Sequence, residues 1–169
     1  NNYFLQEANL LDMSKEIFNS VVDENLKVET RFQLLSNKIQ DAETVNFILA
    51  DGLGFLNLQS TDSFLNEYIN SSVNTTFPSS TNVALTTIAT LKNPIDHGIF
   101  GYYMYDKLNY GLINALNWNK ENKDLLQADY FKNQSSVWNI FKESNIYASN
   151  FQPKNLINTP LSNFLYEEK

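Results

Sequence analysis

The sequence VNFILADGLG, at residues 45–54, is the stretch that decides the fold. It begins with a short, mostly apolar run and ends in a turn signal in which Asp51 precedes two glycines. A short apolar run that stops at a turn is typical of a strand buried on both faces of a parallel sheet. We therefore predict a buried strand over residues 45–50, followed by a sharp turn that places Asp51 at the edge of the sheet.

Outward from this strand, apolar spacing and turn signals predict further strands and helices. The sequence STNVALTTIATL, residues 80–91, begins with hydroxyl residues and continues with an apolar face, which predicts a helix that starts near Thr81. The remaining predicted elements are strands at 73–77 and 146–148, and helices at 64–69, 110–118, 135–144 with Ser135 as N-cap, and from 161 onward. Alternating strands and helices indicate an α/β layer fold, in which ligands gather at the carboxyl ends of the strands.

The first 44 residues show helical spacing but no pattern that suggests chemistry. Their apolar residues predict one helical face within 10–22 and another short element over 32–39. We therefore divide the chain into residues 1–44, an N-terminal helical or extended segment of unknown role, and residues 45–169, which hold the candidate chemistry.

Composition excludes several classes of function. The 169 residues are 43% apolar and 14% aromatic, which is enough for a packed core. The net charge of -7 disfavours nucleic-acid binding, which needs a basic surface, but leaves phosphate esters open because a metal can supply positive charge locally. The absence of cysteine excludes disulfides, zinc-thiolate sites and a cysteine nucleophile.

Signals for cellular location are few. No stretch approaches the roughly 20 apolar residues of a membrane helix, so we expect no membrane span. The chain begins at Asn1 without Met or a signal peptide, so we expect a processed or trimmed product. Asn-x-Ser/Thr sequons at Asn70, Asn74 and Asn133 favour a secreted or cell-surface location, although such sequons also arise by chance in an Asn-rich chain.

Asp51 and Thr81 are the first candidates for chemistry, and each has a structural alternative. Asp51 follows a predicted strand, where a carboxylate suits a hard or borderline cation, but Asp-Gly is also a common turn dipeptide. Thr81 lies at a predicted helix N-terminus, which favours an anion such as phosphate and places a hydroxyl to attack phosphorus. The alternative is an N-cap, which Ser80 or Thr81 would serve equally well.

Other candidates carry weaker signals. His97 is the single histidine of the chain, so it cannot build a catalytic zinc site alone, and a structural hydrogen bond is its expected role. The nucleophile-elbow pattern G-x-S-x-G is absent. Tyr102, Tyr103 and Tyr105 form a cluster that lines either a pocket for a base or aryl group, or simply the surface.

Four segments together, residues 45–54, 76–90, 93–106 and 152–166, resemble the first half of type I phosphodiesterase/nucleotide pyrophosphatases, a branch of the alkaline phosphatase superfamily. The resemblance implies an α/β layered sandwich with helices flanking a largely parallel sheet, which is incomplete in this chain. It also implies two divalent metal ions, usually zinc, and a Thr or Ser nucleophile that is transiently phosphorylated. Residues 45–169 would then be the N-terminal half of such a catalytic domain.

The resemblance assigns roles to individual residues. Asp51 matches the first metal ligand, and Thr81 matches the nucleophile, which also binds metal, because it lies ten positions before the residue that closes the helix. Thr76 is the second choice, since it precedes Phe-Pro as the nucleophile does in nucleotide pyrophosphatases. Asn82 and Tyr102 fall in the substrate pocket. Two departures stand out: Leu91 replaces the closing Gly, and Tyr102 replaces an Asn that donates to the phosphoryl oxygen, which puts a nucleotide substrate in doubt.

The remaining family ligands, an Asp and His pair, an Asp-His dipeptide and a late His, have no match in this sequence. We therefore expect hydrolysis of a phosphate mono- or diester only together with a complementary C-terminal half or a second chain, and an inactive chain on its own. The competing hypothesis is a non-catalytic structural or binding module that keeps the fold without the metals.

Overall fold

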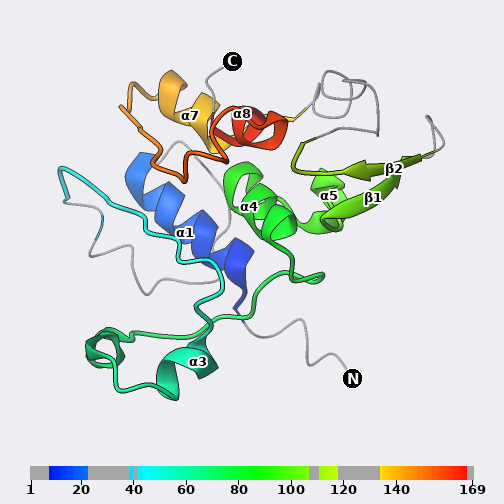
Figure 1. Cartoon of the computed structure of the whole chain (residues 1–169). Coiled ribbons are helices and arrows are strands. Elements are labelled where there is room, and N and C mark those ends of the chain that lie inside the picture. Colours follow the sequence, from blue (N-terminus) through cyan, green and yellow to red (C-terminus); the bar gives the residue numbers. More distant parts are fainter. Residues whose placement is uncertain (1–7, 23–38, 40–41, 107–110, 118–133, 167–169) are drawn as a thin grey trace.

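The computed structural model describes residues 8–22, 39, 42–106, 111–117 and 134–166. Within them, helices and one small sheet follow one another along the chain (Figure 1). The helices and strands are α1 (Leu10–Val22), α3 (Phe55–Gln59), the 3₁₀-helix η2 (Phe64–Tyr68), α4 (Thr81–Thr90), α5 (Pro94–His97), β1 (Tyr103–Asp106), β2 (Gly111–Asn114), α7 (Val137–Glu143) and α8 (Pro160–Tyr166).

Helix α4 lies at the centre of the molecule, in contact with α1, α5, α7 and α8 (Figure 1). It forms where residues 80–91 predicted it, and it buries residues on most of its circumference. Thr86 and Thr90 are buried without loss of hydrogen bonding, because each hydroxyl donates to the carbonyl four residues earlier, at 2.7 and 2.6 Å. The helix ends at Leu91, whose left-handed backbone (φ 53°, ψ 36°) is the conformation that Gly adopts most easily at this position.

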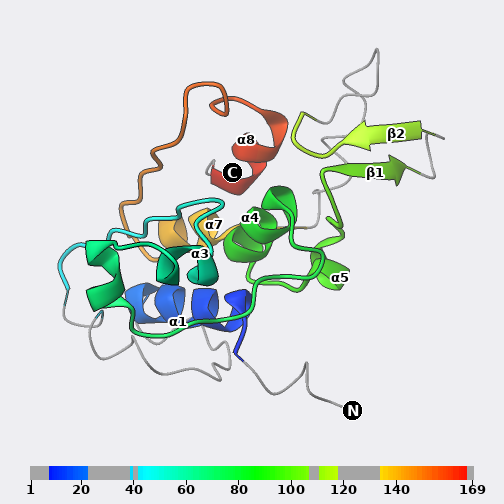
Figure 2. The ribbon, with the colours of Figure 1, turned by 60° about the horizontal axis from the view of Figure 1, so that its bottom comes forward.

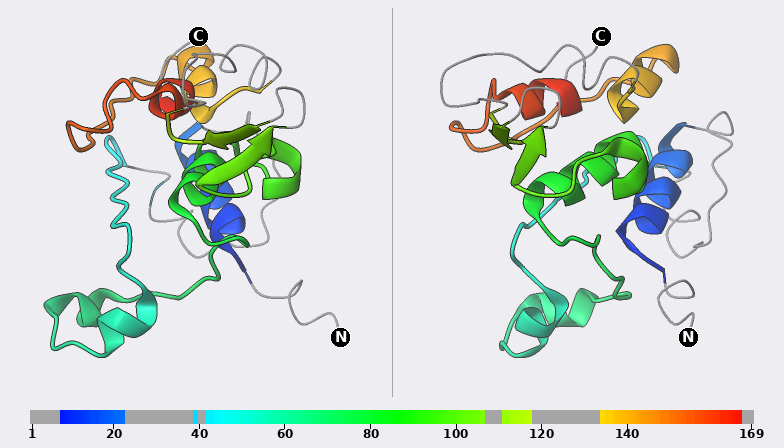
Figure 3. Two further views of the ribbon diagram at one scale, coloured as in Figure 1. Left: turned by 45° about the vertical axis from the view of Figure 1, so that its right-hand side comes forward. Right: turned by 90° about the vertical axis from the view of Figure 1, so that its right-hand side faces the viewer.

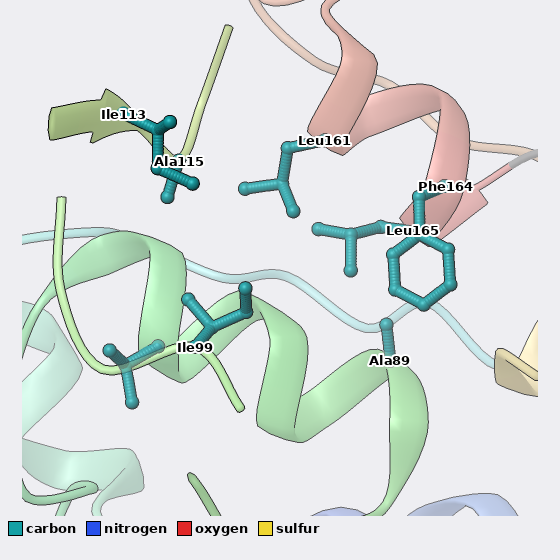
Figure 4. Close-up of a cluster of buried hydrophobic side chains, with 8 residues drawn as sticks. Ala89, Ile99, Ile113, Ala115, Leu161, Phe164 and Leu165 are labelled. Atoms are coloured by element: carbon teal, nitrogen blue, oxygen red, sulfur yellow. The ribbon is translucent and has the colours of Figure 1, made fainter. Parts of the chain in front are cut away.

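Two clusters of buried apolar side chains hold these helices together. The first joins α4 to Ile99, β2 and α8, and Figure 4 shows its side chains converging from these segments. The second joins the end of α1 to α7, where Val22, Val137 and Phe141 are buried. Burial of a large apolar side chain contributes about 1.5–3 kcal/mol, so these clusters are the main source of stability in the described residues.

Helix α1 begins with a reciprocal cap. Asn9 accepts hydrogen bonds through Oδ1 from the backbone N–H groups of Leu11 and Asp12, at 2.9 and 3.1 Å, and Asp12 accepts one from the Asn9 N–H at 3.1 Å. Asn9 also forms a parallel β-bridge with Asn74. The apolar face predicted within 10–22 is confirmed, since Leu10, Leu11, Ile17 and Val22 are buried. The element predicted at 32–39 lies outside the described residues except for Ile39.

The helix predicted at 110–118 is wrong. Residues 111–114 form β2, which pairs antiparallel with β1 and sets Met104 opposite Ile113. Ile113 is buried whereas its neighbour Leu112 is 61% exposed, so the segment has the two-residue period of a half-buried strand. Pairing with β1, a tertiary contact, overrode the apolar spacing that had suggested a helix.

The strands predicted at 45–50, 73–77 and 146–148 do not form in the part of the chain that the structure describes. Residues 45–50 have no regular secondary structure and are all exposed. In the 73–77 segment only Asn74 forms a bridge, and 146–148 has no partner strand among the described residues. A strand needs a hydrogen-bonded neighbour along its length, and apart from the bridge at Asn74 these segments have no such neighbour among the described residues. The described residues thus combine helices with one two-stranded antiparallel sheet, and the predicted layered sandwich is not formed among them.

Residues 42–80, which we call the arm, contain no buried residue. Its helices α3 and η2 contact each other and lie apart from the α1–α4–α7–α8 body in Figures 1 and 3, whereas Figure 2 views the molecule from a direction in which α3 overlaps the body. The short helix predicted at 64–69 is confirmed as η2. The large apolar side chains exposed on the arm are Val45, Phe47, Ile48, Leu49, Leu53, Phe55, Leu56, Phe64, Leu65, Tyr68 and Phe77.

Smaller corrections concern helix ends. The helix predicted at 135–144 is α7, but its N-cap is Ser136 rather than Ser135, and no side-chain hydrogen bond caps it. The segment after α4, for which we predicted no element, contains α5 with Pro94 at its first position, where the missing N–H is not needed. The helix predicted from 161 is confirmed as α8.

Candidate functional site

Asp51 and Thr81, thirty positions apart in the sequence, meet where the arm joins the body. The Thr81 hydroxyl donates a hydrogen bond to Asp51 Oδ2 at 3.0 Å, and both residues are exposed. Thr81 is the first residue of α4, as predicted. A hydroxyl and a carboxylate therefore stand together, open to solvent, at the start of a ten-residue helix.

The N-terminus of α4 has the features of an anion site. The first N–H groups of a helix have no intrahelical partner and carry the positive end of the dipole. The first turn of α4 contains no acidic residue that would occupy them. A phosphoryl group placed beside Thr81 would therefore meet backbone donors and a favourable field.

The capping alternative is not what the structure shows. Ser80 has the extended backbone of an N-cap (φ -114°, ψ 153°), but its side chain makes no cap hydrogen bond, and Thr81 directs its hydroxyl to Asp51 instead. Ser80 Oγ is buried without a hydrogen-bond partner. Neither Ser80 nor Thr81 therefore caps the N-terminus of α4 with its side chain.

Asn82 lies at the start of α4 but faces the interior. Its side chain is 0% exposed, and both of its amide atoms are without a hydrogen-bond partner. Because the whole residue is 0% exposed, a substrate that reaches Thr81 from solvent would meet neither the backbone nor the side chain of Asn82 directly. The structure therefore does not place the side chain of Asn82 in one exposed pocket with those of Thr81 and Tyr102.

Asp51 is held by the turn that its sequence predicted. The Leu53 N–H donates to the Ala50 carbonyl at 3.3 Å, and Gly52 has φ 79°, a left-handed conformation that suits glycine. The two interpretations of Asp51 are thus compatible, because a residue of the turn also contacts Thr81.

Thr76, the second choice for the nucleophile, is placed differently. It is half-buried, and its hydroxyl donates to the Pro78 carbonyl at 3.0 Å. Its proton is thus engaged in a local turn, whereas that of Thr81 is directed to a carboxylate.

Tyr102 precedes β1 and is 43% exposed. Its ring meets that of Tyr103 edge to face at 5.4 Å, and its carbonyl accepts from the Ala115 N–H at 2.8 Å. No hydrogen bond recorded for the described residues joins Tyr102 to Thr81 or Asp51. The three tyrosines are exposed, as their surface interpretation predicted.

His97 has the structural role expected of it. Its ring is 0% exposed and lies between Thr87 Oγ1, at 2.9 Å from Nε2, and the Ile99 N–H, at 3.1 Å from Nδ1. Burial lowers the pKa of His97 from 6.5 to about 4; Lys92 lowers it further, while Asp96 opposes the shift. No local pattern identifies Thr87 as the partner, because its position in the sequence is that of an ordinary residue on a helix face.

The described residues supply only part of the ligand set that a metal site needs. Among the described residues, no three His, Cys, Asp or Glu side chains are grouped so that they could hold a metal ion. The Asp51 carboxylate and the Thr81 hydroxyl offer two oxygen ligands 3.0 Å apart, a donor set that suits a hard or borderline cation. Further ligands would have to come from elsewhere.

Comparison with known proteins agrees with this type of site. The model of one protein family, described as Type I phosphodiesterase / nucleotide pyrophosphatase, matches residues 45–165, well over half of the chain. The chain belongs to the type I phosphodiesterase/nucleotide pyrophosphatase family. No curated protein and no solved structure matches it. None of the helices in the described residues is long and apolar enough to cross a membrane.

Proposed function

We propose that the protein hydrolyses phosphate mono- or diesters through a phosphothreonine intermediate formed on Thr81. Family membership supports a phosphoester hydrolase in general. The observation that carries the specific assignment is the 3.0 Å hydrogen bond from Thr81 to Asp51 at the N-terminus of α4.

In this proposal, Thr81 Oγ forms a bond to phosphorus while the bond from phosphorus to the leaving oxygen breaks, and the proton of the Thr81 hydroxyl ends on that oxygen, which leaves as an alcohol. Water then cleaves the phosphothreonine and releases phosphate or a phosphomonoester. Asp51 orients the Thr81 oxygen by accepting its hydrogen bond, and the positive end of the α4 dipole, with the backbone N–H of the exposed Thr81, favours the phosphoryl oxygens. The exposed ring of Tyr102 is the candidate contact for the alcohol portion of the substrate.

Two divalent cations, zinc by resemblance, complete the proposal. Asp51 and Thr81 would hold one of them, and the ion would supply positive charge that favours the ionised Thr81 hydroxyl and neutralises phosphate. Because the described residues group no three metal-ligating side chains, further ligands would come from a complementary half or a second chain.

The arm supports a complementary partner. Residues 45–50 are extended and carry exposed apolar side chains, among them Ile48 at 85% exposure, and their backbone pairs with no other described segment. Such a segment is stable in water only when another strand and an apolar layer cover it. We expect the isolated chain to associate or to be poorly soluble; a monomeric, cooperatively folding product measured by light scattering and thermal unfolding would contradict this.

The rival proposal is a structural or binding module that retained the fold without metals. The lack of a three-residue metal cluster within the described residues favours it. Elemental analysis of the complete assembly separates the two proposals, since only the hydrolase needs bound metal.

Thr81 provides the decisive substitution. In the active assembly, Thr81→Ala should abolish the phosphoenzyme and lower turnover of an aryl phosphate ester by orders of magnitude, because the nucleophile is lost. Thr81→Ser keeps a hydroxyl and should retain activity. Thr76→Ala is the matched control, and loss of the phosphoenzyme in Thr76→Ala but not in Thr81→Ala would move the chemistry to Thr76. If Thr81 only stabilised the helix end, Thr81→Ala would cost about 1 kcal/mol of stability and leave turnover intact.

Asp51→Asn separates metal binding from hydrogen bonding. The amide oxygen of Asn can still accept from Thr81, so the local turn should persist, whereas loss of the negative charge should lower metal affinity. Metal content by elemental analysis should fall in this variant. An unchanged metal content with lost activity would leave Asp51 as a hydrogen-bond acceptor alone.

A further inference from the structure

His97 is a buried residue with hydrogen bonds on both ring nitrogens, and the proposed hydrolysis does not use it. Besides its two ring contacts, its N–H donates to the Asn93 carbonyl at 3.0 Å, and its carbonyl accepts from Gln134 Nε2 at 3.0 Å. All four polar groups of His97 are therefore engaged, in a residue that is 0% exposed.

The contacts define which ring nitrogen carries the proton. The Ile99 backbone N–H can only donate, so Nδ1 must be the unprotonated acceptor. The neutral ring then has its proton on Nε2, which donates to Thr87 Oγ1. A ring with this tautomer can satisfy both partners at once, whereas the opposite tautomer or a charged ring would place two N–H groups against each other at Ile99.

Thr87 and Ile99 lie in two different segments of the chain, and each segment also contains a residue of the candidate site. Thr87 belongs to α4, whose first residue is Thr81. Ile99 is 0% exposed in the first apolar cluster and begins the short segment 99–102, which ends at Tyr102. Gln134 adds a third connection, because its side-chain oxygen accepts from Lys92 Nζ at 3.3 Å just beyond the end of α4.

We propose that His97 is a positioning residue that locks segment 99–102 to α4, so that Tyr102 and Thr81 keep one relative position during turnover. The part of this proposal that concerns turnover rests on the proposed function. The part that concerns the lock stands on the hydrogen bonds of His97 alone. A histidine that only filled space in the core would need neither a defined tautomer nor the Thr87 hydroxyl.

The test uses Thr87→Val, which removes the hydroxyl but keeps the shape, and Thr87→Ser, which restores it. Thr86→Val is the matched control, because Thr86 is equally buried on α4 but donates to its own helix rather than to His97. Since the chain has a single histidine, its ring ¹⁵N signals are unambiguous in NMR spectra of the full chain. The backbone amide signals of residues 98–102 report the position of the segment.

In the unsubstituted protein at neutral pH, the ring should be neutral with its proton on Nε2. Thr87→Val should shift the Nε2 signal and the amide signals of residues 98–102, Thr87→Ser should reverse both shifts, and Thr86→Val should produce neither. In the active assembly, Thr87→Val should lower kcat by roughly tenfold, within the hundredfold that a misplacement of about 1 Å can cost, with recovery in Thr87→Ser.

Two results would overturn the proposal. A proton on Nδ1, or a charged ring at neutral pH, would exclude the lock without any substitution. Amide signals of residues 98–102 that respond equally to Thr87→Val and Thr86→Val would show a general core effect. A protein without phosphoesterase activity but with the expected ring and amide signals would refute the proposed function and leave the lock in place.

Discussion

The arm and the body are stabilised in opposite ways, although the family match over residues 45–165 includes most of the arm together with α4, α7 and most of α8. The body buries two apolar clusters around α4, whereas the arm, residues 42–80, exposes most of its large apolar side chains. The arm also contains four acidic residues and no Lys or Arg, so no ion pair within it can offset this exposure. The exposed apolar side chains of the arm lie both in residues 45–50 and on α3 and η2, whereas α1, α7 and α8 each pack against α4. Burial of an apolar face, and not the type of secondary structure, separates the two regions.

The candidate site lies across their junction. Asp51 belongs to the arm and Thr81 is the first residue of the body, and the 3.0 Å hydrogen bond between them links the two. A site built this way depends on a rigid helix for its nucleophile and on an unsupported turn for its carboxylate. Any partner that covers residues 45–50 would therefore also secure the position of Asp51.

The two regions should differ most in how much stability they lose when an apolar side chain is replaced by alanine. Leu165 is 0% exposed in the first cluster, so Leu165→Ala should lower the free energy of unfolding by about 2–5 kcal/mol. Ile48 is 85% exposed, so Ile48→Ala should change it by no more than about 0.5 kcal/mol in the isolated chain. Urea denaturation measures both. Equal losses in the two variants would mean that the arm packs as tightly as the body.

A pH titration should reveal a second property found only in the body, because the arm contains no histidine. The pKa of His97 is lowered from 6.5 to about 4 by burial, so between these values the unfolded chain binds a proton that the folded chain does not. The free energy of unfolding should therefore fall as pH drops through this window, by roughly 3 kcal/mol at about 1.4 kcal/mol per pKa unit. His97→Gln should show a flatter pH dependence over the same range. If the free energy of unfolding depended on pH with the same slope in His97→Gln and in the unsubstituted protein, a buried, neutral His97 would be contradicted.

The smallest contrast concerns helix caps. Asn9 caps α1 in the body, and Asn9→Ala should lower the free energy of unfolding by about 1 kcal/mol. Ser63 caps η2 in the arm by accepting from the Leu65 N–H at 3.3 Å. Because the arm can open without the body, Ser63→Ala should leave global unfolding unchanged and only increase hydrogen exchange locally. If Ser63→Ala lowered global stability as much as Asn9→Ala, the two regions would unfold as one unit.

The sequence by itself determined several of the helices, and it suggested the individual candidate residues. Helices α1, α4 and α8 appear where apolar spacing predicted them, because their backbone bonds are local and one face is consistently apolar. Asp51 at a turn and Thr81 at a helix start followed from the same local signals. The family resemblance, read from four short segments, is confirmed by the match over residues 45–165.

Only the tertiary structure decided which segments found partners. Residues 111–114 became a strand because β1 pairs with them, and residues 45–50 formed no strand because no described segment pairs with their backbone, although Phe47 contacts Phe18 of α1. The orientation of Asn82 toward the interior and the bond between His97 and Thr87 likewise depend on what packs against α4. Sheet pairing and buried polar contacts join residues that are distant in the sequence, so their geometry is not encoded in any local pattern.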